Sequence, residues 1–114
     1  MELSFSSRRL EKQMNEGRTM VAAFGEKRAK RLRIVLTALR AAPNLATFAP
    51  PYSPPHRCHE LKGNRKGQLS IDLDGPYRLI IVPAHNPSPK RPDGGLEWSG
   101  VTAIEIRGVV DTHG

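Results

Sequence analysis

A proline-rich segment near the middle of the chain constrains the fold more than any other feature. Residues 42–56 read APNLATFAPPYSPPH and include five prolines. Proline lacks a backbone N–H and has a fixed φ angle, so it is excluded from helix interiors and from central strands. We therefore expect a loop over 42–57, with helices before it and strands after it. At 114 residues the chain has room for one modest core and not for two, so 1–114 is expected to form a single domain.

The part before this loop predicts one strand and two helices. Residues 2–6 alternate between polar and apolar side chains, as a half-buried strand does. Ser6 or Ser7 can then cap a first helix that ends near Gly25. The expected inward positions of this helix are Leu10, Met14, Val21 and Phe24. A second helix, expected over 26–41 and paired with the first as a hairpin, carries an apolar stripe of Ala29, Leu32, Val35, Leu36 and Leu39.

The part after the loop predicts four strands. A short strand is expected around 58–62, followed by QLSIDL at 68–73 and YRLIIV at 77–82, with Asp74 and Gly75 as a two-residue turn between these two. Residues 83–100 hold four prolines and predict a second long loop, whose end Trp98 would fix. The last strand is VTAIEIRGVV at 101–110, with a bulge at Gly108. This order predicts an α+β fold, in which the helical hairpin packs on one face of a mostly antiparallel sheet.

The charge of the chain is strongly basic and unevenly distributed. Eighteen Lys and Arg against eleven Asp and Glu give a formal net charge of +7. Residues 1–42 carry +6 and residues 57–67 carry +3, whereas residues 72–111 carry −2. Such an excess predicts a polyanionic or acidic partner. A solvated basic face is the alternative explanation.

Several classes of protein are not supported by the sequence. There is no apolar run of the roughly 18 residues that a membrane span requires, and the first residues are amphipathic, unlike a signal peptide. A single cysteine, Cys58, excludes an intramolecular disulfide and agrees with a reducing compartment. No second Cys/His pair stands at zinc spacing from Cys58 and His59. We therefore expect a cytoplasmic protein that uses no metal and no cofactor and has no membrane partner.

The stretch RCHELKGNRKGQ at 57–68 concentrates cations and a histidine ahead of the predicted hairpin. Cleavage of RNA by its own 2′-hydroxyl needs a base, an acid, and cations for the negative charge that develops at phosphorus. Imidazole suits the proton transfers, because both of its protonation states exist near neutral pH. Lysine and arginine hold charge and donate hydrogen bonds to phosphate. The chain supplies Arg57, His59, Lys62, Arg65, Lys66, Arg78 and His113 for this chemistry.

Each of these side chains also has a structural interpretation. His59 shares strand parity with an apolar residue, so it could be a hydrogen-bonded core histidine. Arg78 stands among apolar neighbours in a central strand and needs either a carboxylate or a phosphate as its partner. His113 is the penultimate residue, where chains commonly fray. Core packing is likewise favoured over base stacking for the aromatic residues Tyr52, Tyr77 and Trp98.

Taken together, RCHELKGNRKGQLSIDLDGPYRLIIV at 57–82 and VVDTHG at 109–114 resemble the RelE superfamily of bacterial toxins, specifically the HigB-like plasmid-maintenance killer proteins. The resemblance covers nearly the whole chain. Its specific parts are His-x-Leu-Lys-Gly at 59–63, Gly-Gln-Leu-Ser-Ile at 67–71, Tyr-Arg at 77–78 and Asp-x-His at 111–113.

The resemblance implies a RelE-like fold and a ribosome-dependent, metal-independent mRNA endonuclease, the toxin of a type II toxin-antitoxin system. It assigns catalysis to His59, Lys62, Arg78, Asp111 and His113. Beside them, Arg57, Arg65 and Lys66 are expected to bind RNA phosphates. The implied partners are a HigA-like helix-turn-helix antitoxin, the ribosome and translated mRNA, with operator DNA reached only through the antitoxin.

One position departs from the family pattern and bears on the activity. Many relatives have tyrosine between the terminal acid and histidine, where this chain has Thr112. Threonine cannot stack on a base, so the rate or the codon preference would differ. A rival interpretation is a non-enzymatic, ParE-like toxin that arrests growth by binding DNA gyrase, since one fold can serve either function. A third interpretation is an RNA-binding module without catalytic activity.

Overall fold

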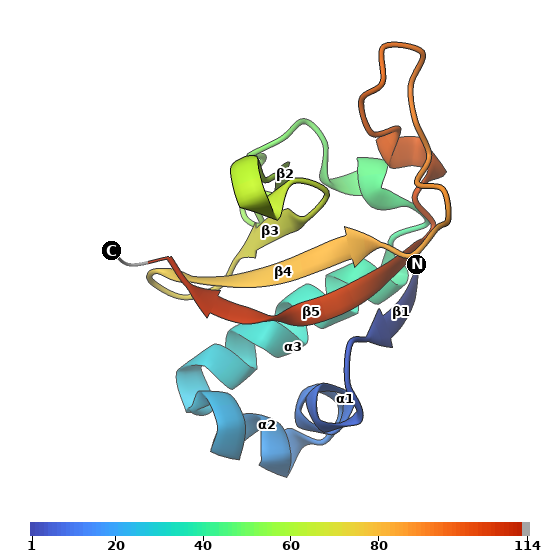
Figure 1. Ribbon diagram of the computed structural model, residues 1–114. Coiled ribbons are helices and arrows are strands. Elements are labelled where there is room, and N and C mark those ends of the chain that lie inside the picture. Colours follow the sequence, from blue (N-terminus) through green and yellow to red (C-terminus); the bar gives the residue numbers. More distant parts are fainter. Residues whose placement is uncertain (113–114) are drawn as a thin grey trace.

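The computed structural model describes residues 1–112 and has an α+β architecture (Figure 1). Within this range the chain forms three α-helices: α1 (Arg8–Asn15), α2 (Gly17–Phe24) and α3 (Glu26–Ala41). It also forms five strands: β1 (Glu2–Phe5), β2 (His59–Glu60), β3 (Leu69–Asp72), β4 (Tyr77–Pro83) and β5 (Ala103–Asp111). Short 3-10 turns occur at η1 (Leu45–Phe48), η2 (Gly63–Arg65) and η3 (Trp98–Gly100). The expected fold class is confirmed.

The five strands make one mixed sheet in the order β1-β5-β4-β3-β2. Neighbouring strands from β5 through β2 are antiparallel, whereas β1 is parallel to β5 and pairs Leu3 with Ile104. The first and last strands of the chain are therefore neighbours, and β4 is the central strand, as its apolar sequence predicts.

The helical region differs from the expected hairpin of two helices. The Ser7 hydroxyl caps α1 by accepting a hydrogen bond from the Leu10 amide at 3.1 Å. Glu16 then has extended backbone angles and ends the helix, so the predicted first helix is in fact two. This break also changes the inward face, because Met20 is buried in α2 while Val21 is 37% exposed.

Helix α3 spans the predicted range and supplies one side of the core. Its apolar stripe, Ala29, Leu32, Val35, Leu36 and Leu39, is fully buried. Figure 1 shows α3 running along one face of the sheet, and the side chains that meet it alternate along the strands, as a pleated sheet requires. These side chains include Leu69, Ile71, Leu79, Ile81, Ile104 and Ile106.

The hairpin between β3 and β4 is one residue longer than predicted. The Leu73 amide donates to the Tyr77 carbonyl at 3.0 Å, which leaves three residues, 74–76, in the turn. Pro76 explains the difference, because it has no N–H with which to pair with Leu73 across a two-residue turn. As a consequence, Asp72 lies directly opposite Arg78 in the ladder.

A β-bulge interrupts the pairing of β4 with β5, as predicted. Ile80 pairs with Gly108 and Ile81 with Ile106, so Arg107 is the extra residue on β5. Gly108 has a φ angle of 149°, a conformation that side chains disfavour. At the bulge, Arg107 and Ile80 line the same cavity.

Both long loops are held by side chains. Leu45 and Phe48 of η1 are buried in the first loop, but Tyr52 is 52% exposed, so it is not one of the anchors. In the second loop, Lys90 pairs with Leu96 in an isolated bridge. Trp98 fixes the end of that loop, because its Nε1–H donates to Glu60 Oε2 at 3.2 Å. Within residues 1–112, no helix has the length and apolar character that crossing a membrane requires.

Candidate functional site

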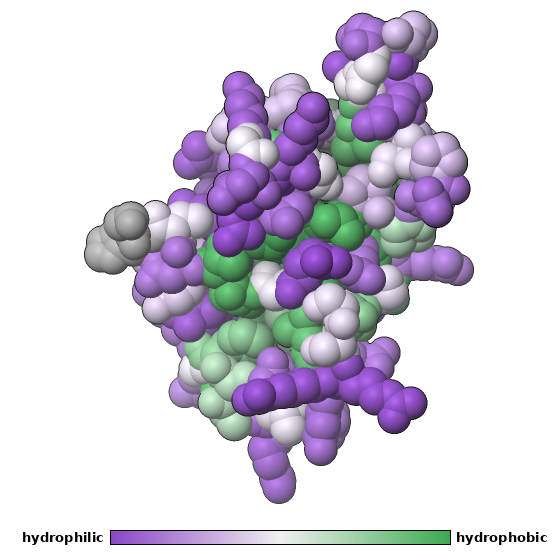
Figure 2. Space-filling view, in the orientation of Figure 1, coloured by the Kyte–Doolittle hydropathy of each residue, from purple (hydrophilic) through white to green (hydrophobic). Residues whose placement is uncertain are grey.

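The sheet face that turns away from α3 carries His59 and Arg78, two of the five expected catalytic residues. His59 pairs with Ser70, and Asp72 pairs with Arg78. Directly opposite residues of an antiparallel pair project to the same side, and Ser70 and Asp72 are two positions apart. These four side chains therefore share one face, which we call the open face. Figure 2 shows apolar groups across the middle of the molecule, with hydrophilic groups gathered around them.

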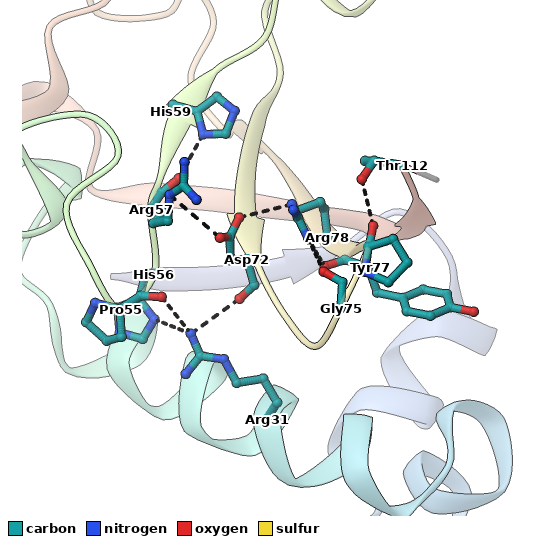
Figure 3. Close-up of polar contacts among 11 residues, drawn as sticks. Arg31, Pro55, His56, Arg57, His59, Asp72, Gly75, Tyr77, Arg78 and Thr112 are labelled. Carbon is teal, nitrogen blue, oxygen red and sulfur yellow. Dashed lines mark hydrogen bonds and ion pairs between the residues drawn. The ribbon is translucent and has the colours of Figure 1, made fainter. Parts of the chain in front are cut away.

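Asp72 is the centre of an ion-pair cluster on the open face (Figure 3). Its carboxylate forms an ion pair with Arg78, with Oδ1 3.0 Å from Nε, and its Oδ2 lies 3.8 Å from Arg57 Nε. The Arg78 and Asp72 side chains are 23% and 19% exposed, whereas that of Arg57 is 52% exposed. Of the two interpretations of Arg78, the structure shows the carboxylate partner. The sequence analysis missed Asp72, which the pairing register identifies.

The Arg78 guanidinium is only partly satisfied by these contacts. Its Nη1 donates to the Gly75 and Tyr77 carbonyls, both at 2.8 Å, and Nε is taken by Asp72. Among residues 1–112, the two N–H groups of Nη2 have no acceptor. A guanidinium fixed on one side and unpartnered on the other is arranged to receive an anion such as phosphate.

His59 is oriented by two contacts and is half-buried rather than a core residue. Its Nδ1 lies 2.8 Å from the Arg57 carbonyl, which can only accept, so Nδ1 carries the proton. Nε2 is then the nitrogen left for proton transfer. The imidazole also stacks on Tyr52, with ring centroids 4.1 Å apart and planes inclined by 14°.

The loop that brings Tyr52 onto His59 has an uncommon backbone. Tyr52 and Arg57 have φ angles of 67° and 49°, which are left-handed conformations that non-glycine residues seldom adopt. The Tyr52 amide donates to the Cys58 carbonyl at 3.1 Å and thereby closes the loop. Backbone conformations of this kind concentrate at functional sites. The prolines on either side of Tyr52 were a signal for such a constrained loop.

A second polar cluster attaches this loop to α3. Arg31 Nη2 donates to the Pro55 carbonyl at 3.1 Å and to the Asp72 carbonyl at 3.3 Å, and it lies 3.4 Å from His56 Nδ1. Burial and the Arg31 guanidinium lower the pKa of His56 below its ordinary value. His56 is therefore neutral at physiological pH and acts as part of the scaffold behind the open face.

A small cavity of about 220 Å³ lies on the open face next to the bulge. Arg65 and Arg107 line it from opposite sides, with Ile80 between them. Arg65 is held by Gln68 Oε1 at 3.1 Å, and Arg107 by Glu105 Oε1 at 2.8 Å. Sequence reasoning assigned Arg65 to phosphate binding but missed Arg107. The bulge predicted at Gly108 was the signal that could have found it.

The end of β5 lies against the β3–β4 turn. Thr112 donates to the Pro76 carbonyl through its amide at 2.9 Å and through its hydroxyl at 2.7 Å. Asp111 pairs with Tyr77 and so projects to the opposite side of the sheet from Arg78. The pairing register thus places Asp111 on the α3 side of the sheet, apart from His59 and Arg78. The expected catalytic residue His113 lies outside the described residues.

Two expected site residues, Lys62 and Lys66, lie elsewhere. Both line a separate cavity of about 410 Å³ between the η2 turn and the 83–100 loop. Lys62 immediately precedes η2, whose first residue, Gly63, has a φ angle of 65°. The bend that could have brought Lys62 toward His59 instead directs it to this second cavity.

Two alternative chemistries have no support in the described part of the chain. Residues 1–112 contain no group of three or more His, Cys, Asp and Glu side chains that could hold a metal ion. Cys58 is fully buried, and burial together with the nearby Glu60 carboxylate raises its thiol pKa to about 12. A thiol of that pKa is not a nucleophile at neutral pH.

Comparison with known proteins adds no identification. No model of a known protein family matches the chain, and no curated protein matches it either. The resemblance to RelE and HigB toxins therefore stays a prediction from the sequence motifs.

Proposed function

We propose that this protein is an RNA-cleaving toxin of the RelE/HigB type, the toxin half of a type II toxin-antitoxin system. The observation that supports it best is the placement of His59 and Arg78 on one face of the sheet. His59 presents Nε2 for proton transfer, and Arg78 presents the two N–H groups of Nη2. Around them the open face carries Arg57, Arg65 and Arg107, which suits a polyanionic strand.

The reaction requires one proton acceptor and one proton donor around a phosphodiester. The 2′-oxygen of the RNA attacks phosphorus as its proton passes to a base, and the bond from phosphorus to the 5′-oxygen breaks as an acid protonates the leaving oxygen. The products are a 2′,3′-cyclic phosphate and a 5′-hydroxyl. In the proposal, His59 and His113 share these two roles, and Arg78 stabilises the negative charge on the phosphate oxygens.

Lys62 and Asp111 have less direct roles in this proposal than in the sequence-based assignment. Lys62 makes no ion pair within residues 1–112, so its long side chain is available to an RNA strand that passes from the open face over β2. Asp111 adjoins His113 in sequence and would orient it. In each case the role follows from the family resemblance, and the contacts around His59 and Arg78 carry the argument.

The proposed partners follow from the charge distribution and from the resemblance. Arg28 and Arg31 are engaged within the protein, because Arg28 pairs with Asp74 at 3.0 Å and Arg31 holds the proline-rich loop. Lys27, Lys30 and Arg33 of α3 are exposed and would contact ribosomal RNA, with an affinity that falls steeply with salt. A HigA-like antitoxin would silence the toxin, and both would act in the cytoplasm.

A specific observation favours the rival function, a ParE-like toxin that binds gyrase without cleaving RNA. Arg78 is already paired with Asp72, and Lys62 lies in a different cavity from the one next to Arg78. A binding surface does not require these groups to converge, whereas catalysis requires RNA to draw them together.

Primer extension on a translated mRNA, with and without ribosomes, separates the two functions. We expect cuts that require the ribosome and that disappear in His59→Ala and His113→Ala. His85→Gln is the matched control, because His85 accepts a hydrogen bond from the Thr102 amide at 3.1 Å, away from the open face. Growth arrest without cuts, retained in His59→Ala, would refute the nuclease and direct the next assay to gyrase supercoiling.

A further inference from the structure

A cavity at the sheet edge formed by β2 is outside the open face, and the reaction proposed above uses only Lys62 among its lining residues. It lies between the β2–η2 segment and the 83–100 loop and encloses about 410 Å³. Small-molecule sites commonly measure 300–1,000 Å³, so a compact ligand fits. In Figure 2, hydrophilic side chains gather over η2 and over the tip of the 83–100 loop, the two segments that form the walls.

The walls of this cavity are cationic. Lys62 and Lys66 contribute from one wall and Lys90 from the other. Within residues 1–112 none of the three lysines has a carboxylate partner in an ion pair. The single acidic residue among the lining residues is Glu60, and its Oε2 is engaged by the Trp98 indole. The cavity therefore attracts anions, with a strength that depends on ionic strength.

The floor of the cavity is apolar, which a site for a bare anion does not need. Leu69 and Leu96 are 1% and 8% exposed, and Leu61 and Pro83 extend the same surface. Glycines complete the lining, and at Gly63, Gly67 and Gly94 the space that a side chain would occupy is open. A flat ring can thus approach the peptide groups closely, where backbone N–H and C=O groups can meet its edge.

We propose that this cavity binds a nucleoside monophosphate unit. The base lies on the leucine floor between the glycine-lined walls, and the phosphate contacts Lys62, Lys66 and Lys90. An apolar, planar body joined to a dianionic group is the ligand chemistry that matches both the floor and the rim. Two kinds of ligand contain this nucleoside monophosphate unit: a free nucleotide, and a single-stranded RNA that contributes one of its residues. The inference does not depend on the proposed nuclease activity.

Amide chemical shifts in the ¹H–¹⁵N spectrum of the full chain test the site directly. Titration with 5′-AMP is expected to shift the amides of Gly63, Gly67, Gly94 and Gly95 to saturation, because all four line the cavity. Lys90→Gln is expected to weaken the affinity about tenfold, since it removes one of three cationic contacts. The matched control is Lys12→Gln, which removes an exposed lysine of α1 outside the cavity.

Three comparisons decide the outcome. If 5′-AMP and inorganic phosphate bind with equal affinity, the proposed contact between the base and the leucine floor is wrong. If the two lysine substitutions weaken binding equally, the ligand does not bind in this cavity. Absence of shifts at the four glycines would overturn the site as well. A trinucleotide RNA that binds more tightly than 5′-AMP identifies RNA as the source, and weaker binding identifies a free nucleotide. Lys90→Gln leaves His59 and Arg78 untouched, so failure here is distinguishable from failure of the nuclease proposal.

Discussion

The ion pair between Asp72 and Arg78 makes the sharpest prediction about stability. The perturbation is a double-mutant cycle of Asp72→Ala, Arg78→Ala and the combination of both. Asp72 Oδ1 and Arg78 Nε are 3.0 Å apart, and the two side chains are 19% and 23% exposed. The pair is therefore more shielded than a surface salt bridge but not buried, so its energy should fall between those two classes.

The magnitude follows from this intermediate exposure. A surface ion pair contributes about 0–1 kcal/mol, whereas removing one partner of a buried pair costs about 3–5 kcal/mol, and we take about 2 kcal/mol for Asp72→Ala. Unfolding entropy near 2.1 cal/mol/K per residue gives about 240 cal/mol/K for this chain, so Tm should fall by about 8 °C. The coupling between the two substitutions should be about 1.5 kcal/mol. In Asp72→Ala, Arg78 still donates to the carbonyls of Gly75 and Tyr77. The coupling energy should therefore be smaller than the loss of stability caused by either single substitution.

Urea unfolding of the four proteins, monitored by circular dichroism, measures the coupling. The matched control is the cycle on Glu105 and Arg107, which are 2.8 Å apart but 31% and 49% exposed. For that pair we expect a coupling of about 0.5 kcal/mol or less. If the Asp72–Arg78 substitutions are additive within about 0.3 kcal/mol, the argument that Asp72 holds Arg78 in place is wrong.

Three further predictions concern single residues. The Cys58 thiol, with its pKa raised to about 12 by burial and by Glu60, should react with a thiol reagent at pH 8 only as fast as the chain unfolds; rapid reaction in native buffer would contradict this burial. Burial and Arg31 hold the pKa of His56 below its ordinary value in the folded protein. Below pH 6.5 the unfolded chain therefore binds more protons than the folded one, and the free energy of unfolding decreases as the pH is lowered. His56→Gln should weaken that dependence in urea titrations at pH 7.5 and 5.5, and an unchanged slope would exclude the ring as its cause. Gly108→Ala should cost about 1–2 kcal/mol by thermal unfolding, because the φ angle of 149° disfavours any side chain although nothing lies within 4 Å of the new Cβ; a neutral effect would show that the bulge relaxes.

The elements set by local periodicity were predicted well from the sequence, and those set by a single turn residue were not. Helix α3 has the predicted bounds, because its apolar stripe is long and regular. The break at Glu16 directly precedes Gly17, a residue that weakens a helix, but the sequence was interpreted as one continuous helix. The largest consequence came from Pro76. A two-residue turn would have placed Ile71 opposite Arg78, whereas the actual turn places Asp72 there.

The candidate site, like the fold, was predicted from the sequence only in part. His59 and Arg78 were found from residue type and motif, and the structure brings them to one face. The second cavity was not foreseen, because it depends on how the 83–100 loop returns to β2 through Trp98. Lys62 lines this second cavity, a position that the sequence did not indicate, and it directly precedes the η2 turn.

The position of β5 in the sheet has a consequence for how the protein is made. β5 is the last strand in the sequence, yet it lies between β1 and β4. During synthesis β1 has no partner and β4 has an open edge until residues 103–111 have left the ribosome. A nascent chain that stops before that point can form α3 and pair β2, β3 and β4, but it lacks the strand that joins β1 to β4. Such a chain exposes unpaired strand edges and apolar side chains, which favour aggregation until β5 is inserted between β1 and β4.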